Sequence, residues 1–227
     1  MPFPDLAERV SEVRGRIAAA AGRGGHGQVV RIVAVTKGHG PEAVEAARQA
    51  GLEDIGENRV QEALRKMQAV TGPLRWHLIG HLQRNKVKWL DHFQLVHSLD
   101  SPRLTDAVHT YGATRGRPVE ALIQINVVGE ETKGGYAPSE IEREAHRIAG
   151  LAGIRVLGVM AMAPFDAGEA TLREVFGGAR EACGVLASAG LPATELSMGM
   201  SNDFEVAVEE GATLVRLGTV LFGARAV

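Results

Sequence analysis

The segment Arg31-Ile32-Val33-Ala34-Val35-Thr36 is a short and almost wholly apolar run, and Lys37 and Gly38 follow it directly. Short runs of this kind, rich in β-branched residues and ended by a glycine, are typical of strands that are buried on both faces. Strands buried on both faces belong to parallel sheets that are covered by helices. The segment therefore indicates an α/β protein, and the rest of the chain repeats the pattern.

Apolar runs alternate with amphipathic segments rich in Ala and Glu along the whole chain. The predicted strands are Arg31–Thr36, Glu53–Gly56, Arg75–Ile79, Gln94–Ser98, Val119–Asn126, Arg155–Met160, Thr194–Met198 and Leu214–Leu217. The predicted helices are Pro41–Ala50, Val60–Ala69, Lys86–Leu90, Arg103–Tyr111, Ser139–Leu151, Thr171–Ala189 and Asp203–Glu210, with an extra helix near Asp5–Ala21. Eight such strands in 227 residues predict one domain, residues 1–227, folded as a (β/α)₈ TIM barrel. An open doubly wound sheet is the alternative, and Gly22–Gly27 is predicted to be a flexible loop before the first strand.

The composition excludes several classes of protein. A formal net charge of −2 gives no general attraction for nucleic acid. The start of the chain lacks the pattern of a signal peptide, and no apolar stretch approaches the roughly 18 residues of a membrane span. We therefore expect a cytoplasmic protein, and a monomer because no long hydrophobic face requires a partner. Cys183 is the only cysteine and is predicted to be a buried, inert thiol.

Lys37 is the first candidate for chemistry, because barrels carry their functional groups at the carboxyl ends of strands. A lysine there would point into the barrel mouth. Desolvation by its neighbours would favour the uncharged amine, which is the form that makes a Schiff base. The ordinary alternative is a lysine at a strand end whose ammonium group reaches the solvent.

Two turns near the end of the chain are candidates for binding an anion. In the first, Ser201 follows a glycine turn and precedes a predicted helix, although an ordinary helix cap would look the same. In the second, Gly218 allows close approach to the backbone and Thr219 adds a hydroxyl. These turns follow the seventh and eighth predicted strands, where barrels frequently bind phosphate. Arg216 lies inside the last predicted strand and needs a partner, and a buried ion pair is the alternative to a ligand contact.

The histidines of Trp76–His81 do not indicate a metal site. His77 lies on a predicted strand and His81, four residues later, at its end, which is poor metal geometry, and no cluster of carboxylates joins them. We expect His77 to be a core residue with satisfied hydrogen bonds and His81 to lie at the strand end near a ligand. No residue is assigned as a metal ligand.

Seven stretches resemble one known family along nearly the whole chain. They are Ala34–Lys37, Gly56–Glu62, Trp76–Lys86, His97–Ser101, Gly158–Pro164, Leu196–Asp203 and Gly211–Arg225. The family is that of the YggS/PROSC pyridoxal phosphate-binding proteins, also called pyridoxal 5′-phosphate (PLP) homeostasis proteins. Small departures are Thr36 where we expect serine, Gly134 in the loop after the fifth strand, and Asn202 in place of a frequent acidic residue.

The resemblance implies a barrel like the N-terminal domain of alanine racemase that holds PLP as a Schiff base on Lys37. It implies that Ser201, Gly218 and Thr219 hold the phosphate and that Arg216 faces the pyridine nitrogen. Asn58 falls in a family motif near the cofactor. The function implied is vitamin B6 homeostasis, in which the protein buffers PLP or delivers it to PLP-dependent apo-enzymes.

An arginine facing the pyridine nitrogen would disfavour its protonation and weaken the electron sink that PLP chemistry needs, which suits racemisation at best and argues against decarboxylation or transamination. Racemisation also needs a second base opposite Lys37, and neither Tyr111 nor Tyr136 is clearly placed to act as one. We therefore assign no catalytic residue and expect a carrier. A slow PLP-dependent amino-acid racemase is the alternative, and a PLP-free barrel that binds a phosphorylated metabolite is a third hypothesis.

Overall fold

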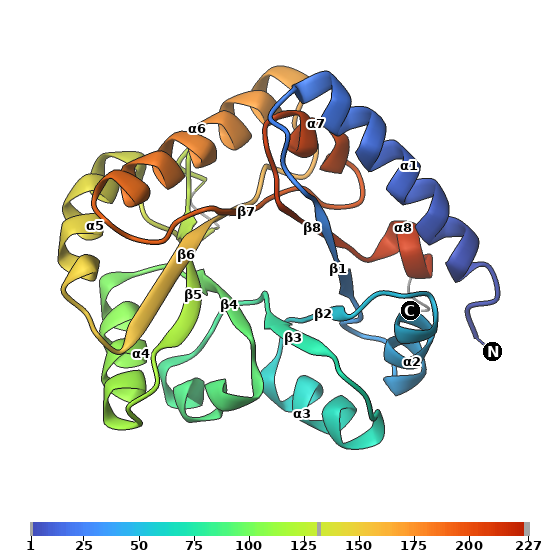
Figure 1. The fold of residues 1–227 in the computed structure, drawn as a ribbon, viewed down its shortest axis with the longest axis horizontal. Coiled ribbons are helices and arrows are strands. Elements are labelled where there is room, and N and C mark those ends of the chain that lie inside the picture. The colour runs from blue at the N-terminus through green and yellow to red at the C-terminus, as the bar shows by residue number, and fades with distance from the viewer. Residues whose placement is uncertain (1, 131–132, 225–227) are drawn as a thin grey trace.

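The computed structural model describes residues 2–130 and 133–224, so Arg225, which ends the last quoted motif, lies outside the described residues. Eight parallel strands form a closed barrel in sequence order, and β8 pairs with β1 to close it. Figure 1 shows this ring of strands inside a ring of helices. The predicted TIM barrel is confirmed, and the open doubly wound sheet is wrong. The strands are β1 (Arg31–Val35), β2 (Asp54–Glu57), β3 (Arg75–Leu78), β4 (Leu95–Leu99), β5 (Val119–Ile125), β6 (Ile154–Ala161), β7 (Glu195–Ser197) and β8 (Leu214–Leu217).

The helices also follow the predicted order. They are α1 (Leu6–Gly24), α2 (Pro41–Gln49), α3 (Val60–Ala69), α4 (Pro102–Thr114), α5 (Ile141–Ala149), α6 (Glu169–Ser188), α7 (Phe204–Glu209) and α8 (Thr219–Phe222). The segment predicted as a helix at Lys86–Leu90 belongs to a longer 3₁₀ helix, η1 (Arg84–His92), and a second one, η2, spans Pro138–Glu140. The short helix α8 after the last strand was not predicted. None of the helices described is long and apolar enough to cross a membrane.

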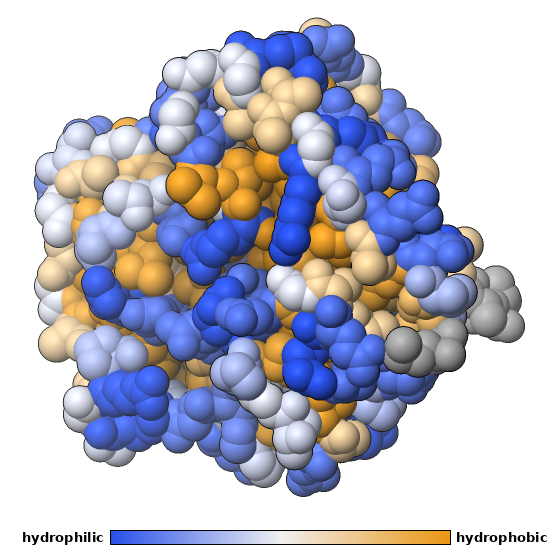
Figure 2. All heavy atoms as spheres, turned by 45° about the vertical axis from the view of Figure 1, so that its right-hand side comes forward, coloured by the Kyte–Doolittle hydropathy of each residue, from blue (hydrophilic) through white to orange (hydrophobic). Residues whose placement is uncertain are grey.

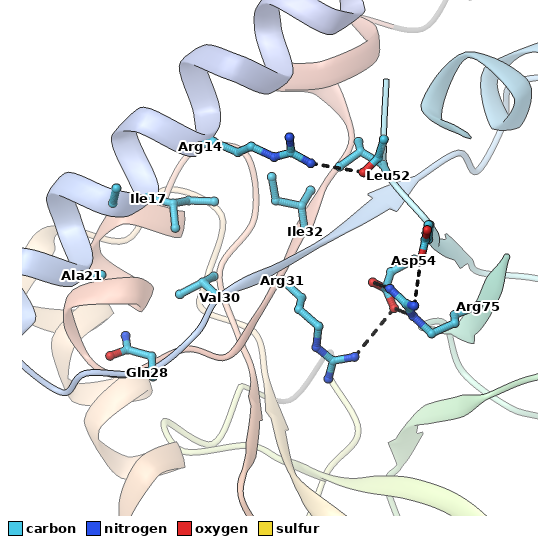
Figure 3. Close-up of a pocket in the computed structure, with 13 residues that line it drawn as sticks. Arg14, Ile17, Ala21, Gln28, Val30, Arg31, Ile32, Leu52, Asp54 and Arg75 are labelled. Carbon is cyan, nitrogen blue, oxygen red and sulfur yellow. Dashed lines mark hydrogen bonds and ion pairs between the residues drawn. The ribbon is translucent and has the colours of Figure 1, made fainter. Parts of the chain in front are cut away.

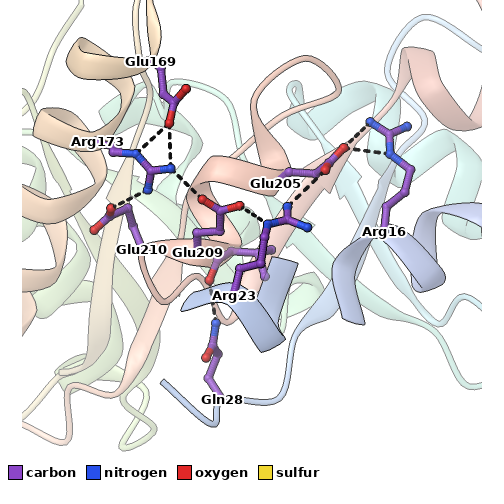
Figure 4. A network of polar contacts seen from close by, with 9 residues as sticks. Arg16, Arg23, Gln28, Glu169, Arg173, Glu205, Glu209 and Glu210 are labelled. Atoms are coloured by element: carbon purple, nitrogen blue, oxygen red, sulfur yellow. Dashed lines mark hydrogen bonds and ion pairs between the residues drawn. The ribbon is translucent and has the colours of Figure 1, made fainter. Parts of the chain in front are cut away.

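The prediction of a loop beginning at Gly22 is wrong, because α1 continues to Gly24. Tertiary contacts explain the extra turn. Arg23 donates to the Glu209 carboxylate at 2.6 Å (Figure 4), and α1 packs along α7 and α8 (Figure 1). A Cβ on Gly24 would lie 2.4 Å from the Glu209 carbonyl oxygen. The glycine that weakens the helix locally is thus the residue that lets α1 lie this close to α7.

Apolar side chains form two layers of core. The inner cluster fills the barrel and consists of Val33, Leu95, Leu122, Met160 and Leu214. A larger cluster lies between the strands and the surrounding helices. Figure 2 shows apolar side chains gathered in a hollow on one face, with hydrophilic side chains around it. Because all eight strands are parallel, their carboxyl ends lie at one end of the barrel, and this end holds the candidate residues.

Candidate functional site

Lys37 lies two residues beyond the end of β1, in a turn that Gly38 makes with a φ of +76°. The residue before it, Thr36, is fully buried and donates its hydroxyl to Glu57 Oε1 at 2.5 Å. Lys37 itself is partly buried. The predicted position of Lys37 at the strand end is therefore correct, and a buried polar cluster fixes the backbone beneath it.

That cluster centres on Lys66, which sequence reasoning missed. Lys66 lies on α3 and is buried, and its Nζ lies 2.5 Å from Glu57 Oε1, 2.9 Å from Glu62 Oε1 and 2.7 Å from the carbonyl oxygen of Thr36. Glu62 Oε1 also accepts the backbone N–H of Gly38 at 2.7 Å. The cluster thus holds the backbone on both sides of Lys37. The spacing of Glu62 and Lys66 by four residues on a helix was the available signal.

The carboxylate of Glu57 lies in an unusual environment within this cluster. Its Oε2 is a buried atom that has no hydrogen-bond partner among the described residues. Burial raises the pKa of Glu57, and the hydrogen bonds from Lys66 and Thr36 oppose that shift. An acid in such a place is the group most sensitive to the loss of its cation.

Arg216 is buried in β8, and its guanidinium lies at the carboxyl ends of two other strands. Its NH1 donates to the carbonyl oxygen of Ser197 at 2.6 Å and to Ser197 Oγ at 2.7 Å, and its NH2 donates to the carbonyl oxygen of Ala161 at 2.9 Å. Ser197 and Ala161 are the last residues of β7 and β6. The described partners are thus carbonyl and hydroxyl oxygens rather than a carboxylate. Burial lowers the pKa of Arg216 to about 10, which leaves it charged at neutral pH.

The two predicted anion-binding turns lie side by side. Ser201 Oγ accepts the backbone N–H of Val220 at 3.2 Å, so this side chain lies at the start of α8. Gly218 immediately precedes α8, and Thr219, its first residue, is exposed. Gly199 turns the chain from β7 toward Ser201 with a φ of +90°, where a Cβ would lie 2.7 Å from the Cβ of Ala207. Hydroxyls and backbone N–H groups from both turns therefore meet beside the last strand.

Asn58 follows β2 at the same end of the barrel and is partly buried. It lines a cavity of about 370 Å³ together with Arg59, Gly80 and His81. Gly80 approaches it so closely that a Cβ there would lie 2.5 Å from the carbonyl oxygen of Asn58. His81 is exposed and contacts Asp100 Oδ2 at 2.8 Å, which agrees with its predicted place at a strand end.

A second cavity of about 420 Å³ lies at the other end of the barrel (Figure 3). Its polar wall contains Arg31, the first residue of β1, and Asp54 and Arg75, which begin β2 and β3. Arg75 binds both carboxylate oxygens of Asp54, at 2.8 and 2.7 Å. In TIM barrels the amino-terminal end serves stability, and these ion pairs fit that role.

The comparisons with known proteins agree with this arrangement. Residues 11–226 match the family model of the alanine racemase N-terminal domain. A protein of Aquifex aeolicus named pyridoxal phosphate homeostasis protein is 42% identical over 224 residues, which are 96% of this chain and 97% of that protein. The protein of the same name from Escherichia coli K12 is 36% identical over 233 residues, with 97% of each chain covered.

Solved structures give the same result. PipY of Synechococcus elongatus, in a structure with PLP bound, is 34% identical and superimposes with a TM-score of 0.85 over 96% of this chain and all of its own. Alanine racemase of Corynebacterium glutamicum is 16% identical with a TM-score of 0.76, which shows a shared fold alone; this chain covers 62% of it. The resemblance drawn from the sequence is confirmed, and this chain belongs to the family of the pyridoxal phosphate homeostasis proteins, which is built on the fold of the alanine racemase N-terminal domain.

Proposed function

We propose that this protein binds PLP through Lys37 and buffers it or delivers it to PLP-dependent apo-enzymes. The observation that carries the proposal is the convergence of an amine after β1, a guanidinium in β8 and a hydroxyl-lined turn beside α8 at one end of the barrel. An aldehyde, a pyridine ring and a phosphate need this combination of partners. The relatives named for PLP homeostasis and the PLP-bound structure of PipY support the same ligand.

The residues at the mouth fit the three parts of PLP. The Lys37 amine would condense with the aldehyde and release water. Ser201, Gly218 and Thr219 would hold the phosphate through hydroxyls and backbone N–H groups, which favour anions at the start of a helix. Arg216 would face the pyridine nitrogen, and Asn58 would line the side of the site. When bound, PLP supplies an electron sink whose strength depends on that nitrogen.

The geometry favours a carrier over a racemase. A charged guanidinium beside the pyridine nitrogen would keep that nitrogen unprotonated and the electron sink weak, which suits racemisation at best and argues against decarboxylation and transamination. Racemisation would also need a second base opposite Lys37. Both tyrosines are engaged elsewhere: Tyr136 OH contacts Thr105 Oγ1 at 2.9 Å, and Tyr111 OH donates to the carbonyl oxygen of Lys88 at 3.1 Å. Burial raises the pKa of Tyr136 to about 12, so it is a poor base at neutral pH. We assign no catalytic residue, and we infer a cytoplasmic monomer that meets its acceptors in solution.

Transfer of PLP to an acceptor tests this function directly. The protein is loaded with PLP, freed of excess ligand, and mixed with a PLP-dependent apo-enzyme under single-turnover conditions. We expect the acceptor to gain activity faster than it would if PLP first dissociated into solution. We also expect the final activity of the acceptor to account for all of the bound PLP. Bound PLP that never reaches the acceptor would contradict delivery, and racemisation of added L- or D-amino acids would favour the enzyme instead.

A further inference from the structure

A chain of buried polar side chains crosses the barrel interior from Arg216 to Asp54. Ser197 Oγ lies 2.7 Å from Arg216 NH1 and 2.8 Å from His97 Nδ1. His97 Nε2 lies 2.9 Å from His77 Nδ1, and His77 Nε2 lies 2.8 Å from Asp54 Oδ1. Ser197 and His97 are fully buried, and His77 is 1% exposed. The chain therefore joins the carboxyl ends of β6 and β7 to the ion pairs at the amino-terminal end of the barrel.

The two ends of this chain fix the direction in which its hydrogen bonds run. Arg216 has only donors, so Ser197 Oγ must accept from it. Asp54 is ionised, because the hydrogen bonds from Arg75 and His77 outweigh its burial and hold its pKa well below the usual range. It accepts only, so His77 donates to it from Nε2, and in a neutral ring Nδ1 is then an acceptor.

The middle of the chain then has one consistent assignment. His97 donates from Nε2 to His77, which leaves His97 Nδ1 free to accept the Ser197 hydroxyl hydrogen. Both rings are neutral in this arrangement, and burial lowers the pKa of His97 well below its usual value. In the reverse arrangement Ser197 Oγ would accept from both Arg216 and His97. Its own hydrogen would then have no acceptor among the contacts described, which is costly in a buried place.

We propose that His97 and Ser197 are positioning residues, which hold the Arg216 guanidinium in one orientation through a hydrogen-bond chain that runs in one direction to Asp54. Three N–H groups of Arg216 are used by Ser197 and Ala161. A guanidinium has five, so among the contacts of the described residues Nε–H and one NH2 hydrogen remain for a ligand. The proposal rests on the proposed function only in assigning that ligand as the pyridine ring of PLP.

The charges at the two ends favour the same direction. Arg216 is the cation at the donor end and Asp54 the anion at the acceptor end, so every dipole between them is aligned from one to the other. Hydrogen bonds in such a chain polarise one another in a low dielectric. The orientation of the Arg216 guanidinium therefore depends on residues that lie far from any ligand at the mouth of the barrel.

The ring tautomers in the ligand-free protein give the first test. In ¹⁵N-labelled wild-type protein at neutral pH, long-range ¹H–¹⁵N spectra should show His77 and His97 as neutral rings protonated at Nε2. A ring of His97 protonated at Nδ1, or a doubly protonated His97, would overturn the proposal. This measurement needs neither a variant nor PLP, so it stands even where a substitution prevents folding.

The second test follows the NH1 hydrogens of Arg216, one of which donates to Ser197 Oγ, in the ligand-free protein. Ser197→Ala should speed their exchange with solvent by about ten- to a hundredfold, because one hydrogen bond to a charged group is lost. Ser197→Thr, which restores a hydroxyl, should recover most of the protection. The matched control is Ser98→Ala, since Ser98 is also buried but donates to the carbonyl oxygen of Gly80, outside the chain. Unchanged exchange in folded Ser197→Ala, or equal acceleration in the Ser98 control, would refute a positioning role.

PLP and an analogue without the ring nitrogen separate this inference from the proposed function. Ser197→Ala should weaken binding of PLP more than binding of the analogue by about tenfold, the lower end of the same hydrogen-bond range. Equal losses, alongside the expected exchange result, would mean that the chain holds Arg216 but that Arg216 does not face the ring. That outcome would contradict the assignment of Arg216 to the ring while the positioning role stands on the two ligand-free measurements.

Discussion

Lys66→Met should destabilise the protein strongly, because it removes the cation from a buried cluster and leaves the acid behind. Lys66 is 4% exposed and Glu57 is fully buried, and the Nζ also holds Glu62 and the Thr36 carbonyl. Breaking a buried pair by removing one partner costs about 3–5 kcal/mol. At roughly 2–4 °C per kcal/mol for a chain of this size, Tm should fall by about 6–20 °C.

The loss should depend on pH in a way that identifies Glu57. A carboxyl whose pKa is raised in the folded protein binds its proton more tightly there than in the unfolded chain. Stability therefore falls as pH rises from the unfolded pKa, about 4.3, through the raised folded value. Without Lys66, the hydrogen bond from Thr36 is the described contact that still offsets this effect, so the deficit of the variant should be smallest in acid and should grow toward neutral pH.

Thermal unfolding of wild type, Lys66→Met and the double variant Lys66→Met/Glu57→Gln provides the assay. Glutamine still accepts the Thr36 hydroxyl but carries no charge, so the double variant should regain a large part of the lost stability at neutral pH. The single variant should also bind PLP more weakly, because the cluster holds the backbone on both sides of Lys37. A loss that is the same at every pH, or a double variant no better than the single one, would refute the reasoning.

Three further predictions concern the mouth and the first helix. Lys37→Ala should abolish borohydride-trapped attachment of PLP, and peptide mass analysis of the wild type should place the adduct on Lys37; an adduct mainly on another lysine would contradict the assignment. Ser201→Ala/Thr219→Ala should weaken PLP binding about a hundredfold or more, at roughly 1.5–3 kcal/mol per hydrogen bond to a charged group, but should barely change binding of pyridoxal. Equal losses for both ligands would indicate damage to the ring pocket. Gly24→Ala should lower the free energy of unfolding in urea by about 1–3 kcal/mol, because its Cβ would lie 2.4 Å from a carbonyl oxygen of α7. Gly22→Ala has nothing within 4 Å of the new Cβ and should raise the free energy of unfolding by up to about 1 kcal/mol. Similar effects of the two variants would mean that α1 does not pack this closely.

The barrel was predictable because every strand carries its own local signal. A run such as Arg31–Thr36 is apolar on both faces, and eight of them in alternation with helices leave few architectures. Errors arose where tertiary contacts override local preference. Gly22 and Gly24 weaken a helix in isolation, yet α1 extends through them because Arg23 and the backbone of α7 hold it. The four residues of α8 were too few to show a helical period.

The candidate site divides in the same way. Lys37, Arg216 and Ser201 could be placed from the sequence, because the ends of predicted strands gather at one end of a barrel. Lys66 was not assigned a role, because its spacing from Glu62 does not report its contacts with Glu57 and the Thr36 carbonyl. His97 was not assigned one, because its importance lies in contacts with residues far away in the chain. The hydrogen bond between His97 and Ser197 joins residues 100 positions apart. No periodicity or motif spacing reports such a contact, and only the closed barrel brings the two side chains together.

Under the proposed function, the seam where β8 meets β1 would tie cofactor capture to closure of the barrel. A growing chain carries Lys37 early, but it lacks Arg216 and the turn of Ser201 until β7 and β8 have been made. Contacts such as that of Arg16 with Glu205, 189 residues apart, add to this late closure. Long-range closure of this kind is slow and forms little before the last strand arrives. Under the proposed function, PLP binds only the closed chain and shifts the folding equilibrium toward it by mass action. The cellular supply of vitamin B6 would then help to set how much of this protein survives quality control, so that its abundance follows the metabolite it handles.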